Sequence, residues 1–441
     1  MTETMGLDLG ENMAVSQEQK AEHAAFGWLV TLTAALFFFY EFIQLNLFNA
    51  IDVQLMEAFH LNAPQLGQLS SMYFYANALC LFPAGILLDR FSTKKLLLGA
   101  VSLCTIGTFI FALAEQYAVA AFGRFLVGMG ASFCFLSCIR LASRWFPPSK
   151  MALVTGLVVT MAMLGGLVAQ TPMAILSGLL GWRHAVLIDA SLGILVALAI
   201  LLIVQDRPPN SEHVAHADRT HLQTLGFWQS IKLVLLNRNN WLGGIYTSLM
   251  NLPVFLLGAL WGIHYLTEVH HVSHIQASYA TTLFFVGVIF GSPAFGWFSD
   301  RIGRRVLPMV IGAIISLGVI LVLMYLPNLT LNALMGLFFL IGFVTSSQVL
   351  SYPAIAELNP SSLTSTAVSV DSVTIMVSGA IFQPFFGWIM ESGNTHAVTA
   401  GGAPIYSAGD FMNAMMIMPI AFILSIFIGW MIKESFCRSQ A

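Results

Sequence analysis

The stretch GWFSDRIGRR, Gly296–Arg305, decides the fold, because it has a counterpart 211 residues earlier, GILLDRFSTKK, Gly85–Lys95. In both stretches a glycine follows a long apolar run, an Asp-Arg pair comes next, and further basic residues close the segment. The repeat extends further along the chain, since AQTP ends at Pro172 and IFQP ends at Pro384, 212 residues apart. Two motifs that recur at nearly the same offset predict two matching halves.

Apolar residues make up 57% of the 441 residues, and charged residues make up only 9%. An average soluble domain is about 25% charged, so a soluble fold of this length could not cover its surface. The apolar residues fall in blocks of about 20, the length that a helix needs to cross ~30 Å of hydrocarbon. Because a backbone in lipid must satisfy its own hydrogen bonds, we expect each block to be a helix. The twelve blocks are 27–50, 68–88, 96–114, 118–140, 151–173, 184–204, 241–263, 279–299, 306–326, 331–351, 366–390 and 411–432. The sequence therefore predicts an all-α membrane protein with twelve transmembrane helices in two six-helix halves.

Polar segments divide the chain into five parts. We expect a short disordered cytoplasmic tail over residues 1–26, a first six-helix bundle over 27–204 and a cytoplasmic linker over 205–240. A second six-helix bundle is expected over 241–432, followed by a cytoplasmic tail over 433–441.

Basic residues mark one side of the membrane. Of the 18 Lys and Arg, all but Arg124 and Arg183 lie in the two tails and in the connections after spans 2, 4, 6 and 8. Because Lys and Arg are retained on the cytoplasmic side, this distribution predicts that both termini are cytoplasmic.

The repeated motif has the chemistry of a conformational latch. A glycine near a helix end allows close approach of a neighbouring backbone, and an Asp can accept hydrogen bonds from a helix N-terminus. Such a cluster can hold one conformation and break in another; the alternative is a pair of basic cytoplasmic loops with no latch. The candidate latch residues are Gly85, Asp89 and Arg90 in the first half and Gly296, Asp300, Arg301, Gly303, Arg304 and Arg305 in the second.

These stretches resemble the signature of the major facilitator superfamily, roughly G-x-x-x-D-R-x-G-R-R after helices 2 and 8. The second stretch fits fully, whereas the first has Ser92 and Thr93 where Gly and Arg are usual. GRFLVGMGA, from Gly123, is similar to the family's helix 4 motif. The resemblance covers residues 27–432 and implies two pseudo-symmetric six-helix bundles that rock about a central site.

The first span carries polar residues where hydrocarbon is expected. In LFFFYEFIQLNLFNA, Leu36–Ala50, we find Glu41, Gln44 and Asn49. At 100° per residue, Glu41 and Gln44 share a helix face with Asp52, and Asn49 lies at its edge. A carboxyl group in lipid is costly, so this face is expected to line a watery site or to meet a partner.

Arg124 is the basic residue placed deep in a span, and the resemblance implies that helices 1 and 4 both line the central site. The depths of Arg124 and Glu41 differ by roughly 5 Å, so the two can meet directly or through a substrate. In one interpretation they bind a charged solute or carry a coupling proton; in the other they form a fixed ion pair.

Other polar side chains within the predicted spans are further candidates for substrate binding or proton coupling. They are Asn77, Gln170, Asn251, Gln348 and Gln383. Gln170 and Gln383 precede the matched prolines, which suggests amides near an outer gate or amides that stabilise kinks. The roles of Asp189, which we expect to pair with Arg183 or His184, and of Asp371, which lies near the cytoplasmic end of its helix, stay open.

One basic residue among acids and amides suits a zwitterion or an organic anion, such as an amino acid, dipeptide, carboxylate or carboxylate siderophore. We expect a secondary active transporter of the inner (plasma) membrane that takes up such a solute with protons. A multidrug or metabolite exporter is an alternative, although the Gly-Pro typical of drug antiporters is missing before Gly165 and Gly166. A membrane sensor that binds solute without moving it is another. The helix 1 stretch and NLPVFLLGALWG, from Asn251, also resemble the lysosomal dipeptide-carrier branch.

No catalytic constellation, nucleotide-binding loop or metal cluster is present in the sequence. We therefore expect no enzyme activity, no cofactor and no metal. The expected partners are a small solute, protons and the lipid bilayer, without nucleic acid, and the chain is expected to act as a monomer.

Overall fold

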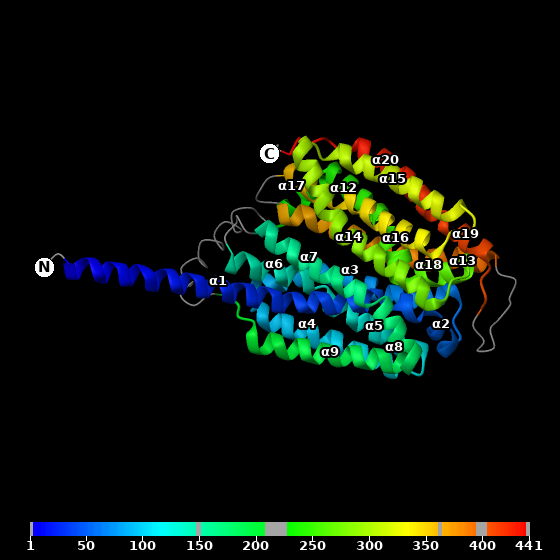
Figure 1. Ribbon diagram of the computed structural model, residues 1–441, viewed down its shortest axis with the longest axis horizontal. Coiled ribbons are helices and arrows are strands. Elements are labelled where there is room, and N and C mark those ends of the chain that lie inside the picture. The colour runs from blue at the N-terminus through cyan, green and yellow to red at the C-terminus, as the bar shows by residue number, and fades with distance from the viewer. Residues whose placement is uncertain (1–2, 147–150, 208–226, 360–363, 394–403, 438–441) are drawn as a thin grey trace.

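The computed structural model describes residues 3–146, 151–207, 227–359, 364–393 and 404–437, and these are arranged as a bundle of long helices (Figure 1). Within them, eleven helical stretches of 20–33 residues are long and apolar enough to cross a membrane. A further long helix, α3 (Ala63–Arg90, 28 residues), runs beside them. The predicted all-α membrane architecture is confirmed.

The first half of the chain forms one group of helices. Its elements are α1 (Glu3–Asn46), α2 (Phe48–Phe59), α3, α4 (Thr93–Leu113), α5 (Tyr117–Ala131), α6 (Cys134–Trp145), α7 (Met151–Val168), α8 (Thr171–Leu180) and α9 (Trp182–Ile203).

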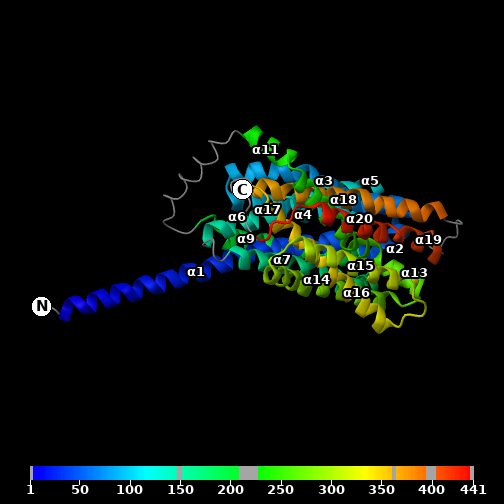
Figure 2. The ribbon, with the colours of Figure 1, turned by 90° about the horizontal axis from the view of Figure 1, so that it is seen from above.

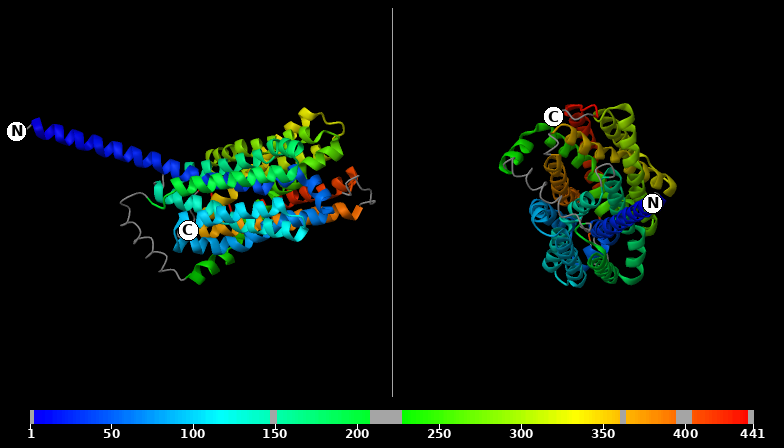
Figure 3. Two further views of the ribbon diagram at one scale, coloured as in Figure 1. Left: turned by 90° about the horizontal axis from the view of Figure 1, so that it is seen from below. Right: turned by 90° about the vertical axis from the view of Figure 1, so that its left-hand side faces the viewer.

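The second half forms a matching group beside it (Figure 2; Figure 3, right). Its elements are α11 (Phe227–Leu236), α12 (Arg238–Met250), the π-helix η3 (Val254–Trp261), α13 (Gly262–His270), α14 (His274–Ile302), α15 (Val306–Tyr325), α16 (Leu331–Thr345), the 3₁₀-helix η4 (Ser346–Leu350), α17 (Ser351–Glu357), α18 (Thr364–Gly393), α19 (Ala408–Met415) and α20 (Ile417–Met431).

Helix α1 begins at Glu3 and projects from the bundle toward the N-terminus (Figure 3, left). Over residues 3–26 the chain is thus helical, where the sequence suggested a disordered tail. The segment is rich in Glu, Gln, Ala and Met, which favour helix, and it extends a helix that is already nucleated by the membrane span.

Several predicted spans are broken into two helical pieces rather than continuous. The first span breaks at Leu47, where the Asn46 side chain donates a 2.8 Å hydrogen bond to the Phe42 carbonyl. The fifth breaks at Gln170, just before Pro172 at the start of α8, and the seventh passes through η3. Breaks of this kind release backbone groups that side chains from other helices can bind.

The two halves meet most closely at the end of the bundle that carries α2, α8, α13 and α19, away from both termini (Figure 1). We refer to this end as the distal end and to the other as the proximal end. A Cβ on Gly67 of α3 would lie 2.7 Å from the Gln383 carbonyl oxygen of α18, so the two backbones are in direct contact. Hydrogen bonds join the halves toward the distal end, among them Thr171 to Thr282 at 2.8 Å. The structure is closed at its distal end.

Candidate functional site

Arg124 is placed in the interior of the first half by close packing of α4 and α5. Gly123, its neighbour, faces Gly107 so closely that an added Cβ would lie 2.7 Å from the Gly107 carbonyl oxygen. Small residues let two helices approach in this way. The approach leaves the Arg124 side chain enclosed, with 1% of its surface exposed.

The Arg124 guanidinium is fixed by protein contacts, but not all of its N–H groups have a hydrogen-bond partner. Its Nη1 donates a 2.8 Å hydrogen bond to the Gln44 carbonyl, in the last turn of α1, and it lies 4.5 Å from the centre of the Phe48 ring. The rings of Tyr73 and Phe111 are 5.5 Å and 6.0 Å away. Aromatic faces attract a cation but give it no hydrogen bonds. Nε and Nη2 are buried without a hydrogen-bond partner, and they are available to an anionic group.

Two buried carboxyl groups belong to the same cluster. Glu41 accepts a hydrogen bond from the Tyr73 hydroxyl, and Asp189 accepts one from the Gln44 amide. The amide of Asn77, one helical turn after Tyr73, lies 3.4 Å from the Tyr73 hydroxyl. Thus Glu41, Gln44, Asn77, Arg124 and Asp189, all singled out in the sequence, come together in one network.

Two details of this network differ from the sequence-based expectations. Asp189 does not pair with Arg183 or His184, whose side chains instead bind the backbone carbonyls of Ala112, Ala114 and Leu180. Glu41 and Arg124 form no ion pair within 4.0 Å, although such pairs occur elsewhere in the described residues. One oxygen of Glu41 is buried without a partner. Tyr73, which was not singled out, connects Glu41 to the helix that carries Asn77.

Charge is unbalanced in this cluster. Among the described residues of this cluster, two buried carboxyl groups, Glu41 and Asp189, lie with one buried cation, Arg124. A buried charge without compensation is strongly unfavourable, so at least one of the two carboxyl groups is expected to hold a proton when no cation is bound. The cluster thus places a guanidinium with unpartnered donors beside two buried carboxyl groups.

The predicted amides Asn49, Gln170 and Gln383 lie elsewhere, around the π-helix η3. Asn49 Nδ2 donates to the Leu257 carbonyl at 3.0 Å and to Gln170 Oε1 at 2.7 Å. Gln170 Nε2 donates to the Gly258 carbonyl at 2.9 Å, and Gln383 Nε2 to the Phe255 carbonyl at 2.9 Å. These amides bind backbone groups that the π-helix exposes, and two of them join the halves.

The remaining candidates lie in the second half. Asn251 caps the C-terminus of α12, and Gln348 is buried in η4 with Oε1 unpartnered. Asp371 is fully buried toward the proximal end of α18, where the Ser351 hydroxyl lies 3.4 Å from one carboxyl oxygen. None of these contacts joins Asp371 to the Arg124 cluster.

The second predicted latch is a network within one half. Arg305 Nη1 lies 2.6 Å from Asp300, and Nη2 lies 2.8 Å from Glu357. Burial disfavours the charged guanidinium, but the hydrogen bonds to Glu357 and Asp300 outweigh it and hold the pKa of Arg305 above its ordinary value. Arg301 lies over the Trp297 ring at 5.4 Å, and Gly303 ends α14 with a φ of 66°, which favours glycine. The Arg304 side chain has no contact that bears on a latch, and those of Asp89 and Arg90 lie outside the described residues.

Two contacts of the latch residues in this conformation differ from those that the motif suggests. A Cβ on Gly85 or Gly296 would meet nothing within 4 Å, so neither glycine serves close backbone approach in this conformation. The carboxyl group at the N-terminus of α15 is that of Glu434, which accepts from the backbone N–H groups of Arg305 at 2.7 Å and Val306 at 3.0 Å, rather than that of Asp300. The first half has an equivalent cap, because Asp206 accepts from the backbone N–H of Lys94 in α4 at 2.7 Å.

One ion pair at the distal end was not expected. Asp52 Oδ2 of α2 lies 3.0 Å from His264 Nδ1 of α13, and both side chains are buried. Asp52 shares a helix face with Glu41, but nothing in the sequence pattern indicated a partner in the other half.

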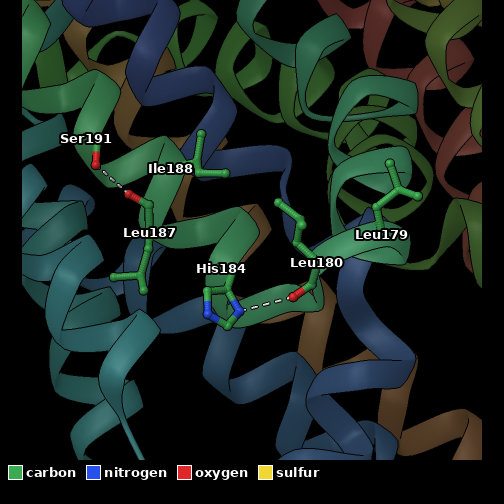
Figure 4. Close-up of a pocket in the computed structure, with 6 residues that line it drawn as sticks. All are labelled: Leu179, Leu180, His184, Leu187, Ile188 and Ser191. Atoms are coloured by element: carbon green, nitrogen blue, oxygen red, sulfur yellow. Dashed lines mark hydrogen bonds between the residues drawn. The ribbon is translucent and has the colours of Figure 1, made fainter.

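A hollow of about 470 Å³ lies on the outer surface of α8 and α9, lined by Leu179, Leu180, His184, Leu187, Ile188 and Ser191 (Figure 4). Its two polar side chains, His184 and Ser191, bind the carbonyls of Leu180 and Leu187 in their own helices. Leu179 is 77% exposed there. This largely apolar surface suits contact with lipid chains.

Comparison with known proteins identifies a matching family of membrane transporters and several relatives. The family model described as Major Facilitator Superfamily matches residues 27–262 and 243–430. The probable sulfoacetate transporter SauU of Cupriavidus necator is 23% identical over 86% of this chain and 89% of that protein. The gentisate transporter of Corynebacterium glutamicum is 24% identical over 84% of each chain. The membrane sensor protein UhpC of Escherichia coli is 26% identical over 74% of this chain and 77% of that protein.

Among solved structures, a bacterial homologue of the human lysosomal transporter Spinster, inward-facing and unoccupied, superposes with a TM-score of 0.75. It is 17% identical and covers 92% of this chain and 97% of its own. At this identity the likeness concerns the fold.

Proposed function

Because the chain belongs to the Major Facilitator Superfamily, we propose that it is a secondary active transporter that takes up a small organic anion or zwitterion together with protons. The observation that carries the proposal is the Arg124 guanidinium, enclosed in the first half with Nε and Nη2 unpartnered beside two buried carboxyl groups.

Arg124 supplies the anion-binding group. A planar guanidinium can bind both oxygens of a carboxylate or sulfonate with parallel hydrogen bonds. Its remaining contacts are aromatic, from Phe48, Tyr73 and Phe111, and these position the cation without using its donors. Two relatives are named as transporters of sulfoacetate and gentisate, both organic anions, which supports this class of substrate.

Glu41 and Asp189 supply the proton sites. An incoming anion neutralises Arg124 and leaves the two carboxyl groups without a cation, so solute binding favours proton uptake. Coupling is reciprocal, and a bound proton therefore strengthens solute binding by the same factor. Glu41 is the first candidate for the coupling proton, because one of its oxygens is unpartnered and the other is bound by Tyr73.

Movement of the two halves carries the solute across. We propose that the proximal end and both termini lie on the cytoplasmic side of the inner membrane, because the Lys and Arg residues of the tails and connecting loops concentrate at that end. The closed distal end would then face outward. The amides Asn49 and Gln170, bound to the backbone of η3 in this conformation, are released when that end opens, and they can then contact solute.

Two other functions make different predictions. A multidrug exporter would confer resistance to lipophilic cations, which an exposed carboxyl rather than a buried arginine would bind. A sensor would bind solute without moving it, and the relative UhpC is named as a membrane sensor.

Transport into liposomes distinguishes these functions. Purified protein would first be screened with carboxylates, sulfonates, amino acids and dipeptides for ligands that raise its melting temperature. Uptake of each hit into proteoliposomes would then be measured with and without an inward proton gradient. We expect accumulation only with the gradient. Binding without any flux would support a sensor, and gradient-driven extrusion of cations would support an exporter.

A further inference from the structure

We propose that His264 and Asp52 form a second proton-binding site, at the interface between the two halves, and that a proton bound there keeps the distal end closed. His264 Nδ1 lies 3.0 Å from Asp52 Oδ2. Asp52 belongs to α2 of the first half and His264 to α13 of the second, so the contact exists only while the halves are together at this end.

The surroundings isolate this pair from water and from other partners. Asp52 is 0% exposed and His264 is 5% exposed. Both Asp52 oxygens and His264 Nδ1 are buried without a hydrogen-bond partner among the described residues. The ionic contact of 3.0 Å between Asp52 Oδ2 and His264 Nδ1 is therefore the polar interaction that these two side chains make there. The Phe411 ring lies 5.1 Å from the imidazole, and the Trp261 ring lies 6.5 Å from it.

Few charged groups compete at this site. Glu268, one turn further along α13, is the second carboxyl group that acts on the imidazole. On α19, Asp410 is next to Phe411, but its carboxyl group caps the helix by accepting from the Ser407 backbone and hydroxyl at 2.8 Å. The contact between Asp52 and His264 is an ion pair that joins the halves, whereas Arg305 pairs with Asp300 and Glu357 of its own half.

The consequence follows from linkage. Imidazole carries a positive charge only when protonated, and without that charge the buried Asp52 carboxylate loses its compensating cation. Protonation therefore stabilises the closed distal end, and loss of the proton favours its opening. By reciprocity, closure makes the proton bind more tightly. This site differs from Glu41, because it joins the two halves directly and acts on closure of the distal end.

The distance between the halves at the distal end tests this inference without any transport measurement. Spin labels would be placed at Glu115 and Leu326, which are exposed in distal loops of the two halves. The half-exposed Cys80 and Cys437 would be replaced by Ser, so that only the introduced cysteines react. Distance distributions would be recorded in lipid nanodiscs without solute at about pH 5.5 and about pH 8, on either side of the ordinary range of histidine.

In the wild-type background we expect the ratio of closed to open distances to fall about tenfold from the lower to the higher pH, the change that corresponds to a tenfold difference in proton affinity between the two states. His264→Gln and Asp52→Asn should each remove this dependence. His270→Gln is the matched control, because His270 is on the same helix but contacts Tyr265 of its own half at 3.4 Å.

A His264→Gln variant with the wild-type pH dependence would overturn the inference. If His264→Gln does not fold, Asp52→Asn is the deciding variant, because the wild-type pH dependence in Asp52→Asn would also overturn the inference. The distances are read without solute and without flux, so this inference and the proposed function can fail separately.

Discussion

Arg124 donates one hydrogen bond of 2.8 Å to the backbone carbonyl of Gln44, while the amide of the same Gln44 donates to Asp189. One residue of α1 thus connects the cation of α5 with a carboxyl group of α9. The arrangement fixes the guanidinium through a neutral group and leaves its other donors for a ligand.

Removal of Arg124 should abolish high-affinity solute binding. We expect Arg124→Ala to weaken binding by roughly 10- to 100-fold, the factor that corresponds to about 1.5–3 kcal/mol for a hydrogen bond to a charged group. Arg124→Lys should rescue only part of this loss, because lysine lacks the planar fork. Calorimetry or thermal-shift titration with the identified solute measures the effect. Arg183→Lys, at the distal end of α9, is the matched control, and unchanged affinity in Arg124→Ala would make Arg124 structural.

A methyl group at the contact between α3 and α18 should open the distal end. In Gly67→Ala the new Cβ would lie 2.7 Å from backbone atoms of Gln383 and Pro384, which cannot move aside as a side chain can. Overpacking of this kind costs about 1–3 kcal/mol, so the open-to-closed ratio should rise by about tenfold or more. Gly85→Ala in the same helix is the control, because its Cβ would meet nothing within 4 Å. Equal distal distances in both variants would contradict the closure described above.

The Arg305 network should affect the rate of the transport cycle more than solute affinity. Glu357 is largely buried, whereas the Asp300 side chain is 68% exposed and is screened by water. We therefore expect Glu357→Gln to change turnover more than Asp300→Asn, with affinity nearly intact in both. The guanidinium stays charged throughout the physiological range, since the pKa of Arg305 is raised by its carboxyl partners despite burial. Turnover and binding would be measured separately, and lost binding with normal turnover would rule out a latch.

The twelve spans and the two halves could be predicted from the sequence, because length and apolarity of a segment decide whether it crosses a bilayer. The periodicity of helix 1 also placed Glu41, Gln44 and Asp52 on one face. It could not indicate which helix that face meets. Asp189 was expected to pair with Arg183 or His184 nearby, yet it meets Gln44, 145 residues away.

The same limit explains the contacts that were missed. Tyr73 binds Glu41, and His264 binds Asp52, across helices that pack only in the folded chain. Gly85 and Gly296 matched a motif, but a motif does not specify what lies opposite a glycine in one conformation of a moving protein. The amides Gln170 and Gln383 matched as a pair, and their common role, binding the carbonyls of η3, depends on a π-helix that has no reliable sequence signal.

Glu41→Gln shows whether Glu41 carries the coupling proton, because glutamine mimics the protonated carboxyl group permanently. Counterflow exchange of labelled solute and accumulation driven by a proton gradient would be measured in the same vesicles, with Asp189→Asn in parallel. We predict that Glu41→Gln still binds and exchanges solute but does not concentrate it, because no proton needs to move with the solute. Gradient-driven accumulation that survives in Glu41→Gln would contradict this assignment and leave Asp189 as the proton carrier of the cluster.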